Sequence, residues 1–127
     1  MERTRGFEVA KGWEDKKINL PRRQTENSAG YDFECAEDTR VPSLLEFLFQ
    51  AFKRVRLGDK MLKPTLVPTG IKAYFQNDEA LFIYNRSGNP LKKYLLLTNG
   101  VGIIDADYYG NPDNDGHIQF QFYNLSP

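Results

Sequence analysis

Residues 99–110 read Asn-Gly-Val-Gly-Ile-Ile-Asp-Ala-Asp-Tyr-Tyr-Gly, and this stretch decides how the rest of the chain is interpreted. The apolar run Tyr94–Leu97 leads into it as one strand, and the Ile-Ile pair leads out as the return strand of a glycine-rich hairpin. Gly100 and Gly102 allow backbone conformations that other residues reach only at a cost. We expect the backbone of this hairpin to face a flat ligand, and the carboxylate of Asp105 to reach a water molecule beside it.

Composition indicates one globular domain over residues 1–127. Apolar residues make up 40% and charged residues 27% of the chain, which is ordinary for such domains. Lys and Arg number 17, as do Asp and Glu, so no net charge draws the chain toward nucleic acid or an anionic membrane. A single cysteine, Cys35, excludes an internal disulfide. We find neither a membrane-length apolar run nor a secretory signal, and therefore expect a cytoplasmic protein.

Short apolar segments separated by turn residues predict a mainly β fold. After a first strand and its turn within 7–20, the candidate strands are 66–67, 71–75, 81–84, 94–97, 103–104 and 118–123. The expected turns are 68–70, 76–78, 87–90 and 111–116. Strands this short at this spacing indicate a β-sandwich or barrel.

One segment, 43–57, has helical rather than β periodicity, with apolar residues on one face and charged residues on the other. Ser43 and Glu46 form a capping-box pattern at its start, and Gly58 is placed to end it. We favour a helix that packs on the β domain over one that binds a protein partner.

Two further motifs carry candidate ligand-binding residues. In Ser28–Phe33, Asp32 follows a glycine, where its carboxylate could hold a hydrated Mg²⁺, although an Asp in this position is also a common turn residue. In Asn85–Gly88, Arg86 offers a planar, permanently charged donor to phosphate oxygens. His117, the single histidine, is expected on the surface or in a strand rather than as a general acid.

These three motifs resemble those of the trimeric dUTP pyrophosphatases (dUTPases). Gly102 to Gly110 reads G-I-I-D-A-D-Y-Y-G, against a family motif close to G-[VL]-I-D-x-D-Y-x-G, and Asn99 stands three residues before its first glycine. Residues 28–33 resemble the first motif, [AS]-A-G-Y-D-[LF]. Residues 85–88 resemble the second motif, P-R-S-G, with Asn85 in place of the proline.

The resemblance extends from about residue 18 to residue 123. Arg86 precedes Asn99 by 13 residues, the separation expected in the family, whereas Asn89-Pro90 replaces the usual Leu-Ala. Most of the family has a short loop in place of residues 37–64, so this segment is interpreted as an insertion. The family's fourth and fifth motifs would follow Pro127 and are absent from this sequence.

The resemblance implies a distorted β-barrel of jelly-roll type, the dUTPase-like β-clip, with one inserted amphipathic helix near 43–57. It also implies Mg²⁺-dependent hydrolysis of dUTP to dUMP and pyrophosphate by a homotrimer with shared active sites. Asp105 would be the general base that activates the attacking water, and Asp32 would hold the metal through water. The implied substrate contacts are Arg86, Ser87 and Gly88 for phosphate, Asn99, Gly102, Ile103 and Ile104 for uracil, and Tyr108 for the deoxyribose.

Alternative interpretations remain open at this point. Asp105 could instead cap the turn, while Asp107 and Tyr109 are interpreted as structural. A dCTP deaminase on the same fold is one alternative function. A non-catalytic nucleotide sensor that binds a protein partner through the helix at 43–57 is another.

Overall fold

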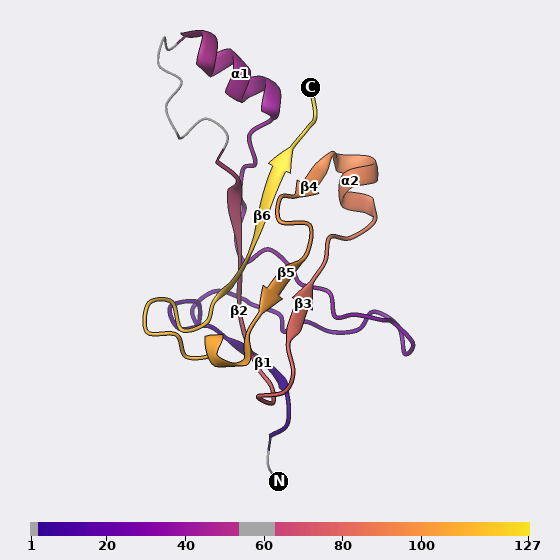
Figure 1. Cartoon of the computed structure of the whole chain (residues 1–127), viewed down its shortest axis with the longest axis vertical. Coiled ribbons are helices and arrows are strands. Elements are labelled where there is room, and N and C mark those ends of the chain that lie inside the picture. The colour runs from indigo at the N-terminus through magenta and orange to yellow at the C-terminus, as the bar shows by residue number, and fades with distance from the viewer. Residues whose placement is uncertain (1–2, 54–62) are drawn as a thin grey trace. The chain divides into compact units, whose positions relative to one another are not determined.

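The computed structural model describes residues 3–53 and 63–127 (Figure 1). Its elements, in chain order, are β1 (Gly6–Val9), α1 (Leu44–Lys53), β2 (Thr65–Tyr74), β3 (Leu81–Ile83), α2 (Gly88–Lys93), β4 (Leu95–Leu97), β5 (Gly102–Ile104), the 3₁₀ helix η1 (Ala106–Tyr108) and β6 (Ile118–Asn124). One sheet has the strand order β1-β2-β6-β4, and a second sheet pairs β3 with β5. The prediction of a mainly β chain is confirmed, and the described strands form these two sheets rather than one closed barrel.

The chain forms two compact units. The first contains the described residues within 1–38, 68–82 and 103–119, and the second those within 39–67, 83–102 and 120–127. The strands β2, β3, β5 and β6 each continue from one unit into the other. None of the helices in the described part of the chain is long and apolar enough to cross a membrane.

The first unit is built around β1 and the second half of β2. These strands run antiparallel, with Gly6 opposite Tyr74 and Val9 opposite Ile71. Its buried apolar side chains are Ala10, Ile71, Ala73 and Ile118. This small core holds together β1, β2 and the start of β6.

The strand β2 continues through the segment where the sequence predicts a turn. Gly70 lies within the strand with a φ of +71°. Its N–H donates to His117 Nε2 (2.9 Å). The Thr69 hydroxyl accepts the N–H of Ile71 (3.1 Å) and donates to the Ile118 carbonyl (2.6 Å). The predicted turn is wrong because two side chains satisfy the backbone groups that this kink leaves unpaired, and the strand therefore continues.

The second unit is built around β4 and the end of β6. These strands run antiparallel, with Leu95 opposite Asn124. The side-chain amide of Asn124 also donates to the Val41 carbonyl (3.0 Å), just before α1 begins. The buried apolar side chains of this unit are Ile83, Leu97 and Phe122.

The predicted capping box begins α1. The Ser43 N–H donates to a Glu46 carboxylate oxygen, and the Glu46 N–H donates to the Ser43 hydroxyl, both at 3.2 Å. Arg40 forms a salt bridge with the same carboxylate. The predicted helix is confirmed from Leu44 to Lys53, and its remaining part, with Gly58, lies outside the described residues.

The apolar side chains of α1 do not pack as expected. Leu44, Leu45, Leu48, Phe49 and Phe52 are all exposed, and Phe52 retains 90% of its accessible surface. For the described residues, the prediction of a helix packed on the β domain is therefore wrong. Amphipathic periodicity shows that a helix has an apolar face, but it does not identify what covers that face.

The prediction of a β-hairpin around Asn99 is also wrong. Its two arms, β4 and β5, belong to different sheets: β4 pairs with β6, whereas β5 pairs with β3. The glycine-containing turn is therefore a connection between two sheets. Sequence proximity favoured pairing between the arms, but both strands find partners that lie elsewhere in the chain.

His117 is buried rather than on the surface or in a strand. It lies directly before β6, is 7% exposed, and its ring centroid lies 5.1 Å from that of Trp13. Because Nε2 accepts the Gly70 N–H, a proton added there would face another donor. Burial lowers the pKa of the imidazole below its ordinary value of 6.5.

We predict that the free energy of unfolding decreases as the pH is lowered, and that His117 causes part of this decrease. A lowered pKa in the folded state means that unfolding takes up a proton between that pKa and the ordinary value of 6.5. The stabilising contribution is thus complete above 6.5 and is lost as the pH falls through this window. We expect the free energy of unfolding, measured with urea at fixed protein concentration, to drop less between pH 7.5 and pH 5 in His117→Gln than in the wild type.

The His117→Gln variant keeps an acceptor for the Gly70 N–H but cannot be protonated. Carboxyl groups that titrate in the same range are common to both proteins and cancel in the comparison. Equal pH dependence in the two proteins would contradict the prediction.

Candidate functional site

The predicted site residues are divided between the two units. Asp32, Ile103, Ile104, Asp105 and Tyr108 belong to the first unit. Arg86, Ser87, Gly88, Asn99 and Gly102 belong to the second.

Asp105 stands at the junction between β5 and η1. Its backbone is extended, and its carbonyl accepts the N–H of Tyr108 (3.1 Å), which closes η1. The side chain is exposed and does not cap η1, and it forms no hydrogen bond or salt bridge with any residue that the structure describes. The alternative role of Asp105 as a turn cap thus lacks the hydrogen bond it requires, and the carboxylate faces solvent.

The hydroxyl of Tyr108 is used inside the first unit. It donates to the His117 carbonyl (2.9 Å) and accepts a hydrogen bond from the Asn114 amide (2.6 Å). The side chain is half-buried. The ring is therefore held at a fixed angle, three residues after Asp105, and a ligand would meet the ring rather than the hydroxyl.

The two glycines before Asp105 have different roles. Gly100 has a φ of +70°, and its N–H donates to the Leu97 carbonyl (2.9 Å), so it forms the turn. Gly102 has no such φ, but a Cβ there would stand 2.6 Å from Ile83 Cδ1 and 3.4 Å from the Asn99 amide nitrogen. The absence of a side chain at Gly102 therefore allows β5 to lie against β3 and leaves the Asn99 amide close to the backbone. The expected conformational freedom holds for Gly100 and not for Gly102.

A helix, α2, begins at Gly88, directly after Arg86 and Ser87. The sequence did not predict this helix. The segment expected to be a turn begins α2, in which Pro90 lies in the first turn, where a missing N–H costs nothing. Gly88-Asn89-Pro90 was the signal that could have indicated this helix. The Ser87 hydroxyl makes no capping hydrogen bond, and the helix ends at Tyr94 with a φ of +58°.

Asn85, which stands in place of the family's proline, braces this segment. Its amide nitrogen donates to the Leu95 carbonyl (3.0 Å), and its amide oxygen accepts from the Asn89 amide (2.8 Å). Both ends of α2 are thus tied to one side chain. The departure from the family pattern replaces a rigid ring with two hydrogen bonds and leaves Arg86 and Ser87 in position beside α2.

Asp32 lies on an extended segment in the first unit. Its N–H donates to the Arg22 carbonyl (2.9 Å), and its side chain is half-buried. Aromatic neighbours on either side, Tyr31 and Phe33, pack edge-on against Phe7 of β1. Over the residues that the structure describes, no group of three or more His, Cys, Asp or Glu side chains could hold a metal ion.

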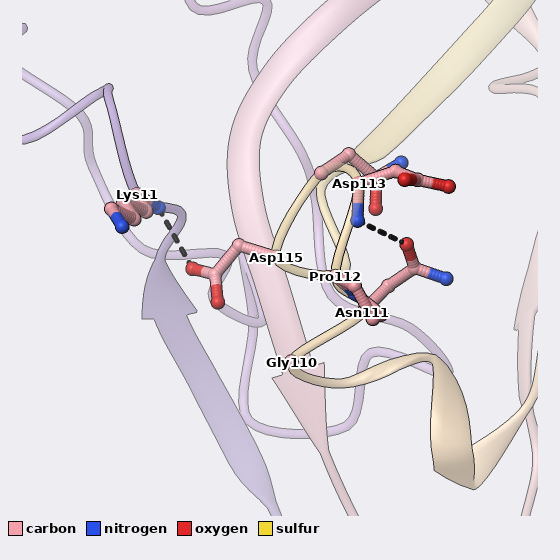
Figure 2. Close-up of a pocket in the computed structure, with 7 residues that line it drawn as sticks. Lys11, Gly110, Asn111, Pro112, Asp113 and Asp115 are labelled. Atoms are coloured by element: carbon pink, nitrogen blue, oxygen red, sulfur yellow. Dashed lines mark hydrogen bonds between the residues drawn. The ribbon is translucent and has the colours of Figure 1, made fainter.

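A pocket of about 540 Å³ lies in the first unit, between Lys11 and residues 110–115 (Figure 2). The Lys11 N–H donates to an Asp115 carboxylate oxygen, and the Asp113 N–H donates to the Asn111 side-chain oxygen, both at 2.9 Å. No predicted site residue lines this pocket. Its polar groups hold the loop in shape, and it does not contain the predicted chemistry.

Comparison with known proteins gives consistent results. The chain is 46% identical over 122 residues to the deoxyuridine 5′-triphosphate nucleotidohydrolase of Lactococcus lactis, covering 96% of this chain and 69% of that protein. It is 34% identical over 114 residues to the Corynebacterium jeikeium protein of the same name, covering 89% of this chain and 57% of the relative. With the Psychrobacter cryohalolentis protein of that name, the identity is 35% over 98 residues, and 53% of the relative is covered. The chain thus spans little more than half the length of these last two relatives. No protein-family model matches it.

A solved structure points to the same family. The crystal structure of dUTPase from Streptococcus mutans has a TM-score of 0.76 and 41% sequence identity, and covers 95% of this chain and 80% of its own. Because these alignments cover 95% or more of this chain, they include most of residues 37–64. The segment interpreted as an insertion therefore has a counterpart in these two relatives.

We predict that Gly102→Ala destabilises the protein. The added methyl group would collide with Ile83, and overpacking of this kind costs about 1–3 kcal/mol. The matched control is Gly30→Ala, because a Cβ at Gly30 has no heavy atom within 4 Å and no unusual φ. Urea unfolding at fixed protein concentration should show a loss for Gly102→Ala and a change near zero for the control; an equal effect of both changes would show that the Ile83 contact is not the cause.

Proposed function

Because the chain belongs to the deoxyuridine 5′-triphosphate nucleotidohydrolase (dUTPase) family, a family of nucleotide hydrolases, we propose that it hydrolyses dUTP to dUMP and pyrophosphate. A water oxygen forms a bond to the α-phosphorus, and the bond from that phosphorus to the oxygen bridging to the β-phosphate breaks. The observation that carries this proposal is the Asp105 carboxylate, which is exposed and forms no hydrogen bond or salt bridge with the described residues, within the stretch Gly102–Gly110 that resembles the family's motif.

Asp105 is the proposed general base. It orients the attacking water and accepts its proton. A side chain already engaged in a cap or salt bridge would have to break that contact first, and Asp105 has neither with the described residues. The junction between β5 and η1 also fixes the backbone from which the carboxylate extends.

The phosphate groups are assigned to Arg86, Ser87 and Gly88. The guanidinium offers a fork of donors to phosphate oxygens, and the Ser87 hydroxyl is not used as a helix cap. The Gly88 N–H, at the start of α2, is assigned to the same oxygens. Donors of this type stabilise phosphate charge as it shifts during the reaction.

The uracil is assigned to Asn99 and to the backbone of Gly102, Ile103 and Ile104. The Asn99 amide lies close to Gly102, where no side chain intervenes. Paired with the edge of the base, these groups would accept uracil and reject cytosine, whose exocyclic donor would meet donors. The Tyr108 ring, fixed by its hydroxyl, is assigned to the deoxyribose, where a 2′-hydroxyl would clash.

Mg²⁺ is the proposed cofactor. The ion would neutralise phosphate charge that opposes the approach of the nucleophilic oxygen. Asp32 is the residue assigned to it, through water. One half-buried carboxylate suits an ion that keeps most of its waters and is bound mainly by substrate phosphates.

We further propose a homotrimer in which neighbouring subunits share active sites. The proposed residues come from well-separated parts of the sequence, so one small β domain makes a poor closed pocket by itself. Groups from a second subunit would complete it.

We predict that Asp105→Asn lowers kcat for dUTP at least about a hundredfold, because a positioned general base contributes about 10²–10⁴. Pyrophosphate release from the full-length protein with Mg²⁺ would be measured for dUTP, dTTP, dCTP and UTP. The matched control is Asp107→Asn, an exposed carboxylate two residues further along, in η1, which should leave kcat within about threefold.

The same assay separates the alternatives. Wild-type kcat in Asp105→Asn would exclude Asp105 as the base. Ammonia release from dCTP would indicate a deaminase, and the absence of turnover with all four nucleotides would favour a nucleotide sensor.

We predict that Asp32→Asn raises the Mg²⁺ concentration needed for half-maximal dUTP hydrolysis, because the neutral amide interacts more weakly with the waters of a hydrated ion. Titration of Mg²⁺ after removal of metal with EDTA measures this directly. Asp78→Asn, in the exposed turn after β2, is the control. An unchanged Mg²⁺ requirement in Asp32→Asn would contradict the assignment.

A further inference from the structure

The short helix η1 cannot hold Asp105 in place by itself. It consists of three residues, Ala106–Tyr108, none of which is buried. A 3₁₀ helix of this length has few hydrogen bonds of its own, with poorer geometry than those of an α-helix. The position of the Asp105 carboxylate therefore depends on contacts that the neighbouring residues make with the rest of the first unit.

One such contact is made by Tyr108 at the end of η1. Its hydroxyl donates to the His117 carbonyl, and its own carbonyl accepts the N–H of Asn111 (3.1 Å). These bonds join η1 to the following loop and to the start of β6. They give η1 no direct hydrogen bond to β1 or β2.

Tyr109 supplies that connection. Its hydroxyl donates to the carboxylate of Glu8 in β1. Its ring meets the ring of Tyr74 edge-on, with centroids 6.1 Å apart, and the Lys72 ammonium lies 4.9 Å from the ring centroid. One side chain, four residues after Asp105, thus contacts both strands of the β1–β2 pair.

The loop after Tyr109 is attached to the same strands. Lys72 forms a salt bridge with Asp115 (2.7 Å), which also accepts the N–H of Lys11 (2.9 Å). The Gly110 N–H donates to the Asp115 carbonyl (3.2 Å). Tyr109 therefore lies between a fixed loop and the fixed strands, and the direction of η1 follows from the position of Tyr109.

The electrostatics favour this hydrogen bond at neutral pH. The Tyr109 hydroxyl is the main cause that holds the pKa of the Glu8 carboxyl below its usual range, and Arg3 and Lys72 act in the same direction. In return, the Glu8 carboxylate raises the pKa of the Tyr109 hydroxyl. The donor stays protonated and the acceptor stays ionised, which gives a charge-assisted bond.

We propose that the hydrogen bond between Glu8 and Tyr109 positions Asp105 for catalysis, an inference that rests on the proposed function. Neither residue touches the substrate. They act by fixing the end of η1 to β1, so that the carboxylate at the other end of η1 stands where the attacking water is bound.

The test is a comparison of steady-state kinetics with dUTP for Tyr109→Phe, Glu8→Ala and Glu8→Gln in the full-length protein. A displacement of about 1 Å can cost about a hundredfold in rate, and because the Tyr108 contacts remain, we expect kcat to fall about tenfold with KM within about twofold. Glu8→Gln keeps an oxygen acceptor and should recover most of the kcat lost in Glu8→Ala. The double variant Tyr109→Phe with Glu8→Ala should lose no more than either single variant, because both remove the same bond.

The matched control is Tyr94→Phe, which also removes a tyrosine hydroxyl, on an exposed side chain in the second unit. It should leave kcat and KM unchanged. Thermal unfolding of each variant identifies any loss that comes from instability, and if Tyr109→Phe does not fold, the comparison of Glu8→Ala with Glu8→Gln decides.

The outcomes separate this inference from the proposed function. A wild-type protein without dUTP turnover would overturn both. With an active wild type, the inference is overturned by unchanged kcat in Tyr109→Phe, by a loss confined to KM, or by additive losses in the double variant.

Discussion

Where β2 kinks at Gly70, the ring of His117 takes the place of a backbone hydrogen-bond partner. The Gly70 N–H donates to this buried imidazole, and Thr69 next to it joins β2 to the start of β6 through its hydroxyl. A buried N–H without a partner would cost about 1–3 kcal/mol of stability. The kink therefore needs a hydrogen-bond acceptor beside it, and the neutral imidazole of His117 supplies one.

The candidate site depends on this arrangement through backbone as well as side-chain atoms. The carbonyl of His117 accepts the hydroxyl of Tyr108, so the residue that supports β2 also holds η1. The Trp13 ring packs against the imidazole, with ring centroids 5.1 Å apart. A buried polar cluster thus connects the β1–β2–β6 core with the segment that presents Asp105.

The proposed contacts come from two segments that are held in different ways. The proposed base and sugar contacts lie on β5, η1 and the turn before them, whose geometry is determined by Gly100, by Gly102 against Ile83 and by the Tyr108 hydroxyl. The proposed phosphate contacts lie at the start of α2 and just before it, where Asn85 forms two hydrogen bonds in place of the family's proline. A substitution in the second motif has therefore preserved a fixed segment by different means.

Local chemistry made much of this predictable from the sequence. The capping box of Ser43 and Glu46 begins α1 because both partners lie within one helical turn. Most of the strands and the turn at Gly100 were also predicted from the sequence. The same sequence resemblance identified the dUTPase family, which the relatives confirm.

Tertiary structure decided what depends on distant partners. The Tyr94–Leu97 and Ile103-Ile104 segments are both strands, but they pair with β6 and β3 and not with each other, because a strand's partner is chosen by the core it can join. The Pro-Thr-Gly segment before Ile71 is a kink within a strand because His117, far along the chain, satisfies it. The hydrogen bond from Tyr109 to Glu8 joins residues about a hundred positions apart, and no local sequence pattern predicts it. The sequence by itself predicted most of the strands, the start of α1 and a set of candidate site residues. The fold decided which partners these elements have, because long-range hydrogen bonds and packing leave no periodicity in the chain.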